Sequence, residues 1–198
     1  MASVAQLQHR MLHYQPRLKW SRRWRRRSAV AMVLRDGGRG LEVLMIQRAE
    51  CEGDPWSGHM AFPGGHQDPE DRHGFDAACR ETLEEVGLDL RAQGRSMGRL
   101  SDIPVQRRMV RRGMVISPFL FAVEAQPALA PNHEVADVLW IPLPFLADAS
   151  NRQSMRWETA DFELTLPCYW YEGQRIWGLS LMMLDELLTL LRGEFDRA

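Results

Sequence analysis

Short apolar runs separated by turn-forming residues occupy much of the chain and predict strands more often than helices. Residues 29–34 form one such run, typical of a buried strand, and residues 41–47 form a second. The turn sequence Asp36-Gly37-Gly38 lies between them, so the two runs predict a β-hairpin. Further strands are expected at residues 59–62, 95–103, 114–123 and 134–141, with a late hairpin of residues 157–165 and 169–177 around Glu172-Gly173.

Three other stretches carry apolar residues at helical spacing and predict helices. They are residues 4–13, 75–86 and 180–191, and Pro142 and Pro144 bracket one short helical turn. Ser180 is the expected N-cap of the closing helix and Gly193 its C-terminal stop. Many strands with one central and one closing helix predict an α/β fold, in which helices cover a mixed sheet within a single domain.

Composition supports one globular domain and gives no sign of a nucleic-acid or membrane partner. The chain has 198 residues, of which 45% are hydrophobic and 26% charged, so it can bury a core. Its net charge of −1 gives no overall attraction to nucleic acid or membranes, and no apolar run approaches the roughly 20 residues of a membrane span. Three cysteines without a CxxC pair argue against both a disulfide scaffold and a thiolate zinc site.

The basic residues are concentrated near the start of the chain. No Asp or Glu precedes Asp36, whereas residues 17–27 hold six arginines and the chain's one lysine, Lys19. We expect residues 1–27 to form a helix and a basic connector, which could contact a second copy in a homodimer. An acid-free, Arg-rich start is also seen in mitochondrial transit peptides, but cleavage there would endanger the first strand, so a cytoplasmic protein is expected.

Three glutamates share one side of the predicted helix at residues 75–86. With 100° per residue and Glu81 at 0°, Glu84 falls at about −60° and Glu85 at about +40°. The apolar side, between about 100° and 200°, is formed by Phe75, Cys79, Thr82, Leu83 and Val86. The pattern predicts an amphipathic helix whose acidic stripe lies opposite its apolar stripe.

A solvent-exposed face is the ordinary explanation of such an acidic stripe, but two observations favour a cation site. Glu81 and Glu85 are like charges at i,i+4, an arrangement that destabilises a helix. They also lie late in the helix, where the helix dipole disfavours anions. A hard divalent ion such as Mg²⁺ or Mn²⁺ would offset both costs.

The residues around this helix resemble the Nudix hydrolases, whose motif is G-x5-E-x7-R-E-U-x-E-E-x-G-U, with U aliphatic. Here Gly65 is followed after five residues by Asp71, and after eight more by Arg80-Glu81-Thr82-Leu83-Glu84-Glu85-Val86-Gly87-Leu88. Three departures are Asp71 in place of Glu, one additional spacer residue, and Thr82 in place of an aliphatic residue. The resemblance implies an α/β/α sandwich with a mixed sheet and a catalytic loop-helix-loop, within residues 28–198.

The first two departures, together with Phe62-Pro63-Gly64-Gly65, resemble the coenzyme A pyrophosphatase-like branch of the family. Residues 44–49 resemble the start of that branch's upstream element, but residues 54–58 follow one position later than in the branch. Arg48 and Trp56 are the candidate substrate contacts; Trp56 could stack on a base or line the mouth of the site, and packing is an equally ordinary interpretation of it. The cluster Arg107, Arg108, Arg111 and Arg112 could hold an additional phosphate or RNA, with Arg108 as the candidate, although a solvated loop is the ordinary interpretation.

The resemblance implies hydrolysis of a diphosphate linked to another group, often a nucleoside diphosphate derivative. Glu81, Glu84 and Glu85 would bind Mg²⁺ or Mn²⁺, assisted by Asp71 and the carbonyl near Gly65. Arg80 would orient a glutamate. Glu134 is the candidate general base, although a surface loop acid is its ordinary interpretation. Glu81, Arg80, Glu84 and Glu134 are thus the predicted catalytic residues.

Other functions stay open at this point. The substrate could be coenzyme A or a derivative, or another nucleotide such as ADP-ribose, a dinucleotide or an RNA 5′ end. The chain could also be a binding module on the same fold with vestigial acids, although retention of Arg80 and all three glutamates argues against that. A small nucleotide diphosphate is the expected partner, and nucleic acid and membranes are not.

Overall fold

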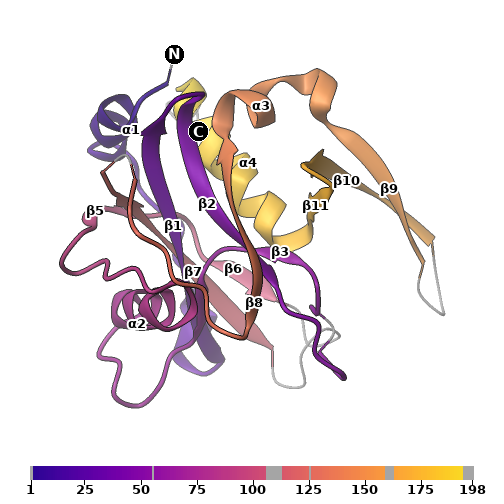
Figure 1. Ribbon diagram of the computed structural model, residues 1–198. Coiled ribbons are helices and arrows are strands. Elements are labelled where there is room, and N and C mark those ends of the chain that lie inside the picture. The colour runs from indigo at the N-terminus through magenta and orange to yellow at the C-terminus, as the bar shows by residue number, and fades with distance from the viewer. Residues whose placement is uncertain (1, 55, 106–112, 125, 159–162, 194–198) are drawn as a thin grey trace.

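The computed structural model describes residues 2–54, 56–105, 113–124, 126–158 and 163–193 (Figure 1). Its centre is a mixed sheet built on the predicted hairpin, β1 (Arg26–Gly37) and β2 (Gly40–Arg48), which closes where Gly37 pairs with Gly40. On its other edge β1 pairs in parallel with β7 (Met114–Ala122). The remaining pairs are antiparallel: β8 (Val135–Pro142) with β2, and β5 (Arg95–Arg99) and β6 (Ile103–Val105) with β7.

Two short strands split the central hairpin and bring the double glycine into the sheet. The β1–β2 pairing ends at Leu34↔Val43, beyond which β3 (Met60–Ala61) pairs with β2 and β4 (Gly64–His66) pairs with β1. The carbonyl of Pro63, between β3 and β4, accepts a hydrogen bond of 2.8 Å from the Ala31 amide. Gly64 and Gly65 are therefore strand residues, a pairing that the sequence did not predict.

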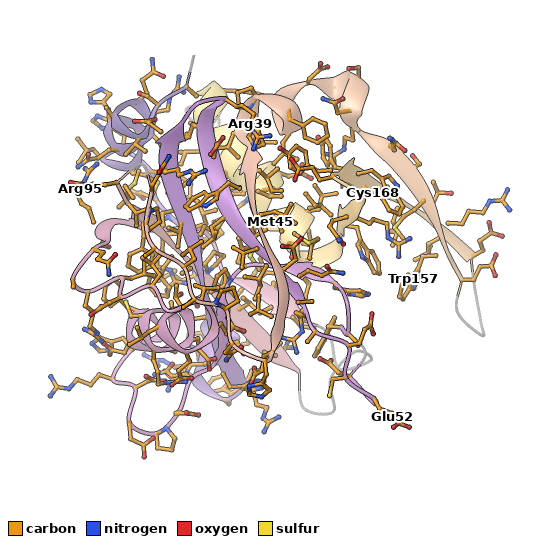
Figure 2. All side chains as sticks on the ribbon, in the orientation of Figure 1. Arg39, Met45, Glu52, Arg95, Trp157 and Cys168 are labelled. Carbon is orange, nitrogen blue, oxygen red and sulfur yellow. The ribbon has the colours of Figure 1, made fainter. Side chains whose placement is uncertain are left out.

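Both faces of the sheet are buried, because alternate residues of each central strand enter different apolar clusters. Ala29, Ala31 and Val33 of β1 pack with α2 (Gly74–Val86), whereas Met32 and Leu34 pack with α1 (Val4–Met11) and α4 (Gly178–Arg192). Met45 of β2, labelled in Figure 2, belongs to the cluster formed with α1 and α4. The predicted α/β fold with a helix-covered mixed sheet is confirmed.

The N-terminal helix is part of this core. Leu7 of α1 is fully buried in the same cluster as α4, and the Val4 amide donates to the Asp36 carboxylate. After α1 the chain continues through a 3₁₀ turn, η1 (Trp20–Arg23), directly into β1. The sheet thus begins at Arg26, and α1 is part of its core, whereas the sequence predicted residues 1–27 to be a helix and a basic connector ahead of the domain.

A second, three-stranded sheet follows the short helix α3 (Leu143–Ala147) and the 3₁₀ turn η2 (Ala149–Asn151). It consists of β9 (Gln153–Glu158), β10 (Glu163–Tyr171) and β11 (Gln174–Trp177), and the β9–β10 end projects from the body (Figure 1). Figure 2 shows Trp157 of β9 well away from α2. The predicted late hairpin is thus correct for the β10–β11 turn but misses β9 as a separate strand.

Two other predictions of secondary structure are wrong. The strand predicted at residues 95–103 breaks after Arg99, because the buried Asp102 carboxylate accepts hydrogen bonds from the Lys19 amide and the Ser117 hydroxyl. The N-cap of α4 is Trp177, not Ser180, whose hydroxyl donates instead to the Met60 carbonyl at 2.9 Å and ties α4 to β3. Gly193 ends α4 in the left-handed conformation, as predicted.

None of the helices in the described ranges combines the length and apolar character needed to cross a membrane.

Candidate functional site

The acidic helix α2 begins and ends as its sequence predicts. The Asp76 carboxylate accepts a hydrogen bond of 3.0 Å from the His73 amide at the N-terminus. At the other end Gly87 has a φ of 70°, and its amide donates to the Leu83 carbonyl. Because a residue with a side chain is strained at positive φ, Gly87 fixes the place where the helix stops.

The rotation of α2 about its axis differs from the helical-wheel prediction. Leu83, assigned to the apolar side, is 49% exposed, whereas Glu85, assigned to the acidic stripe, is only 3% exposed. The buried side runs through Ala77, Ala78, Cys79, Thr82, Glu85 and Val86. The physical reason is a hydrogen bond of 2.8 Å from the Gly64 amide to the Glu85 carboxylate, which turns that glutamate toward β4.

Glu85 is a buried carboxylate held by the main chain. Burial raises the pKa of Glu85 from its ordinary value of 4.5 to about 7, opposed by the hydrogen bond from Gly64. Within the described part of the chain, no basic side chain forms an ion pair with it. A buried acid without a cation is costly, so this position is suited to an additional positive charge.

Glu81 lies against Gly65, the first glycine of the motif. A Cβ on Gly65 would fall 2.3 Å from Glu81 Oε1, so only glycine leaves room for the carboxylate in its observed place. Burial raises the pKa of Glu81 as well, and the neighbouring Arg80 guanidinium opposes this shift. The close approach of β4 to α2 therefore depends on a residue without a side chain.

Arg80 connects the loop between β4 and α2, which contains Asp71, to the glutamates of α2. Its Nη1 lies 3.1 Å from both Glu81 Oε1 and Glu84 Oε2, and its Nη2 lies 3.0 Å from Asp71 Oδ2. Nη2 also donates to the His66 carbonyl at 3.0 Å. Hydrogen bonding to Asp71 is the main reason that the pKa of Arg80 is raised. One guanidinium thus fixes Asp71, Glu81 and Glu84 relative to each other.

The structure places Glu81, Glu84 and Asp71 around Arg80, Gly65 against Glu81, and Glu85 beside the Gly64 amide. Sequence reasoning misses the Gly64 amide and the His66 carbonyl, because main-chain groups give no signal in residue type. It also misses the ion pair of 3.5 Å between Arg80 and Asp68, an exposed loop acid.

Of the other predicted site residues, Arg48 ends β2, Trp56 lies on the segment after β2, and Glu134 directly precedes β8. Arg48 binds the Asp54 carboxylate at 2.6 Å, and the Trp56 amide also donates to Asp54. The Arg48 Nε is buried without a hydrogen-bond acceptor in the described residues. The charges of Arg48 and Glu134 both act on the pKa of Glu85, so these two residues border the acidic cluster. Arg108 lies outside the described residues.

The donor set has the chemistry of a divalent metal site. Carboxylate oxygens and a main-chain carbonyl are the ligands that Mg²⁺ and Mn²⁺ prefer. In the described residues no three acid, His or Cys side chains converge at metal distance, and Arg80 Nη1 contacts both Glu81 and Glu84. Buried Glu85, with no ion pair in the described ranges, is the observation that fits a bound metal.

Comparison with known proteins gives the family. The NUDIX domain profile matches residues 24–161. The mouse protein named mitochondrial coenzyme A diphosphatase NUDT8 is 31% identical over 140 residues, covering 70% of this chain and 65% of that protein. The Nudix hydrolase NudL of Yersinia pestis is 30% identical over 132 residues, covering 66% of this chain and 63% of that protein. The chain thus spans less than two thirds of the length of these curated relatives.

Solved structures show the same fold at lower identity. A MutT/nudix family protein from Enterococcus faecalis superposes with a TM-score of 0.57 at 20% identity, covering 98% of this chain and 70% of that one. A Caenorhabditis elegans Ap4A hydrolase complex gives a TM-score of 0.55 at 18% identity, covering 85% of this chain and 98% of that one. With the domain profile matching more than half of its residues, the chain belongs to the Nudix family.

Proposed function

We propose that this protein is a metal-dependent pyrophosphatase that hydrolyses the diphosphate bond of a nucleoside-diphosphate-linked substrate. The observation that carries the proposal is Glu85, buried beside the Gly64 amide with no ion-pair partner in the described residues. Glu81 and Glu84 lie on the same helix within reach of Arg80. A diphosphate is strongly anionic, and the glutamates give the site a negative charge. The site therefore needs bound cations before it can bind a diphosphate.

Each residue has a distinct role in this proposal. Glu81, Glu84 and Glu85 hold Mg²⁺ or Mn²⁺, with Asp71 and the Gly65 carbonyl as additional ligands. A bound divalent ion lowers the pKa of water and neutralises phosphate oxygens. Arg80 fixes the carboxylates in place. Glu134 is the proposed general base, because it lies close enough for its charge to act on Glu85.

Coenzyme A or a derivative is the proposed substrate. The similarity to the mouse coenzyme A diphosphatase supports it, as does the position of Arg48 at the border of the acidic cluster. ADP-ribose, a dinucleotide and an RNA 5′ end are the alternatives. The proposed compartment is the cytoplasm, but the mouse relative is named as mitochondrial, and the Arg-rich N-terminal segment is compatible with that address.

The test is turnover of a substrate panel by the full chain, comparing Glu85→Gln with the wild type. The panel contains coenzyme A, ADP-ribose, dinucleoside polyphosphates and nucleoside triphosphates, each with Mg²⁺, with Mn²⁺ and with EDTA. We expect EDTA to stop hydrolysis, and Glu85→Gln to lower kcat at least about 100-fold while the fold is kept. Glu158→Gln, an exposed glutamate on β9, is the matched control and should leave kcat unchanged.

Normal turnover by Glu85→Gln would contradict the proposal. If the wild type releases no phosphate from any substrate with either metal, the second candidate is favoured, a Nudix-fold binding module. The joint presence of Glu81, Glu84, Glu85 and Arg80 in one contact network is the reason to prefer the enzyme.

A further inference from the structure

A second cavity lies at the start of β1, apart from the acidic cluster. It has a volume of about 460 Å³ and is lined by Leu18, Lys19, Trp20, Arg23 and Arg27, here named the Lys19 pocket. That volume is within the range of roughly 300–1,000 Å³ typical of sites for small molecules. None of these five residues belongs to the site described above.

The charge of the Lys19 pocket is positive and uncompensated. Three of its five residues are cations, and in the described part of the chain none of the three forms an ion pair with a carboxylate. By contrast, Arg80 binds Asp71 at 3.0 Å, and Arg152 binds Asp185 at 2.6 Å. Free positive charge in a concave site attracts an anion.

One wall of the Lys19 pocket is an exposed aromatic ring. Trp20 is 69% exposed, and the edge-to-face contact with Trp24, at 4.4 Å between ring centroids, supports the indole. Nucleobases stack on exposed rings of this kind. An aromatic ring beside three cations is the chemistry that recognises a base together with a phosphate.

One lining residue of the Lys19 pocket, Arg27, contacts the loop that joins β4 to α2 through its main chain. Arg27 is two residues before Ala29 on β1, so its side chain is on the same sheet face as α2. The Arg27 carbonyl accepts from the Gln67 amide at 2.9 Å, and Arg80 donates to the neighbouring His66 carbonyl. Arg27 also lies only about 7 Å along the strand from Ala29, the partner of Gly65. In Figure 1 the start of β1 and α2 lie at the same end of the molecule.

We propose that the Lys19 pocket is the nucleotide subsite of this hydrolase. Trp20 stacks on the base, and Lys19, Arg23 and Arg27 bind a phosphate of the nucleotide, while the diphosphate that is cut lies at α2. This inference rests on the proposed function for its link to catalysis. The limited volume of the pocket, about 460 Å³, favours one nucleotide over the extended backbone of a nucleic acid, which requires a longer basic stripe.

The first test is binding of AMP to the full chain in EDTA, where no hydrolysis can occur. The readouts are calorimetry and the NMR shift of the Trp20 indole N–H. We expect Trp20→Ala and Arg27→Ala each to weaken AMP binding about tenfold, with an unchanged melting temperature. Trp170→Ala on β10, 47% exposed, and Arg156→Ala on exposed β9 are matched controls that should bind AMP normally.

The second test is kinetic, with whichever substrate the panel identifies. We expect Trp20→Ala and Arg27→Ala to raise KM about tenfold and to change kcat less than about twofold. Weaker AMP binding without a change in KM would overturn the subsite assignment. Unchanged AMP binding in both variants would overturn the pocket itself, even if hydrolysis is confirmed.

A third measurement separates the pocket from a nucleic-acid surface. A single-stranded 12-nucleotide RNA without a 5′ phosphate should bind no more tightly than AMP. Tighter, strongly salt-dependent binding of this RNA, lost in Arg27→Ala, would overturn the proposal in favour of a nucleic-acid surface. If no substrate is hydrolysed, the proposed function fails, and the AMP measurement still decides whether the pocket binds a nucleotide.

Discussion

Glu42 and Glu85 are two glutamates buried to almost the same degree, 2% and 3% exposed, and they have opposite surroundings. Glu42 of β2 binds Arg35 at 2.8 Å and Arg39 at 3.3 Å, at the end of the molecule where Figure 2 labels Arg39. Glu85 accepts a hydrogen bond from the Gly64 amide and, in the described residues, has no ion pair.

Glu42 and the site glutamates are alike in a second respect, because a glycine packs against a carboxylate in both places. A Cβ on Gly37 would fall 2.3 Å from Glu42 Oε2, and a Cβ on Gly65 would fall 2.3 Å from Glu81 Oε1. Close packing of a carboxylate on a strand is therefore not by itself a sign of function. The difference is the counter-charge: arginine supplies it to Glu42, whereas the cluster of Glu81 and Glu85 keeps a net negative charge that a ligand can neutralise.

The largest expected effect is on stability at Glu42. Glu42→Gln removes the buried charge that Arg35 and Arg39 bind, so the free energy of unfolding should fall by about 3–5 kcal/mol. Glu85→Gln removes a buried charge that lacks a cation, so without metal it should not destabilise the fold. Urea unfolding in EDTA at pH 8 measures both. An equal loss in the two variants would remove the distinction between the glutamates.

The same contrast predicts a pH dependence. Because the pKa of Glu85 is raised to about 7 in the folded chain, folding favours the protonated carboxyl. The stabilisation from Glu85 is complete below about pH 4.5 and is lost as the pH rises through 7. In EDTA the wild type should lose up to roughly 3 kcal/mol relative to Glu85→Gln between pH 4.5 and pH 8. A difference in unfolding free energy that stays constant with pH would contradict a buried, unpaired Glu85.

The smallest of the three expected effects is a difference between alanine substitutions of Gly65 and Gly37. Gly65→Ala should displace the Glu81 carboxylate and lower kcat about 100-fold, because a shift near 1 Å is enough to disturb catalytic geometry. Gly37→Ala should displace Glu42 and lower the melting temperature, with kcat unchanged. Steady-state kinetics and thermal unfolding of both variants measure this crossing pattern. Loss of activity in Gly37→Ala at a temperature where it is folded would contradict it.

The sequence predicted the components of the site better than their orientation. Helix α2, its three glutamates and Arg80 follow from residue type and spacing, because these are local properties. The burial of Glu85 does not, because it depends on the Gly64 amide, 21 residues away along the chain and placed by pairing with β1. A hydrophobicity pattern assigns leucine to the core and glutamate to solvent, so it exchanges Leu83 and Glu85.

Strand β4 was missed for a related reason. Gly64-Gly65-His66 has little intrinsic preference for a strand, and its conformation comes from the pairing partners that β1 supplies. The Lys19 pocket was equally hidden, since its basic residues appeared as a charge-rich connector. Only the fold shows that Arg27 lies beside the catalytic loop.

The insertion of β3 and β4 between the two halves of the central hairpin affects which parts of the protein tolerate changes in sequence length. The segment of β3 and β4, which carries Gly65 of the proposed metal site, pairs with β2 and β1, while residues 49–54 and 56–59 form an excursion from the sheet between β2 and β3. Insertions in that excursion can alter which molecules fit without displacing the carboxylates. The one-residue shift of residues 54–58 is a change of this kind. The sheet positions the carboxylates, and the loop can change in length and in substrate selectivity without moving them.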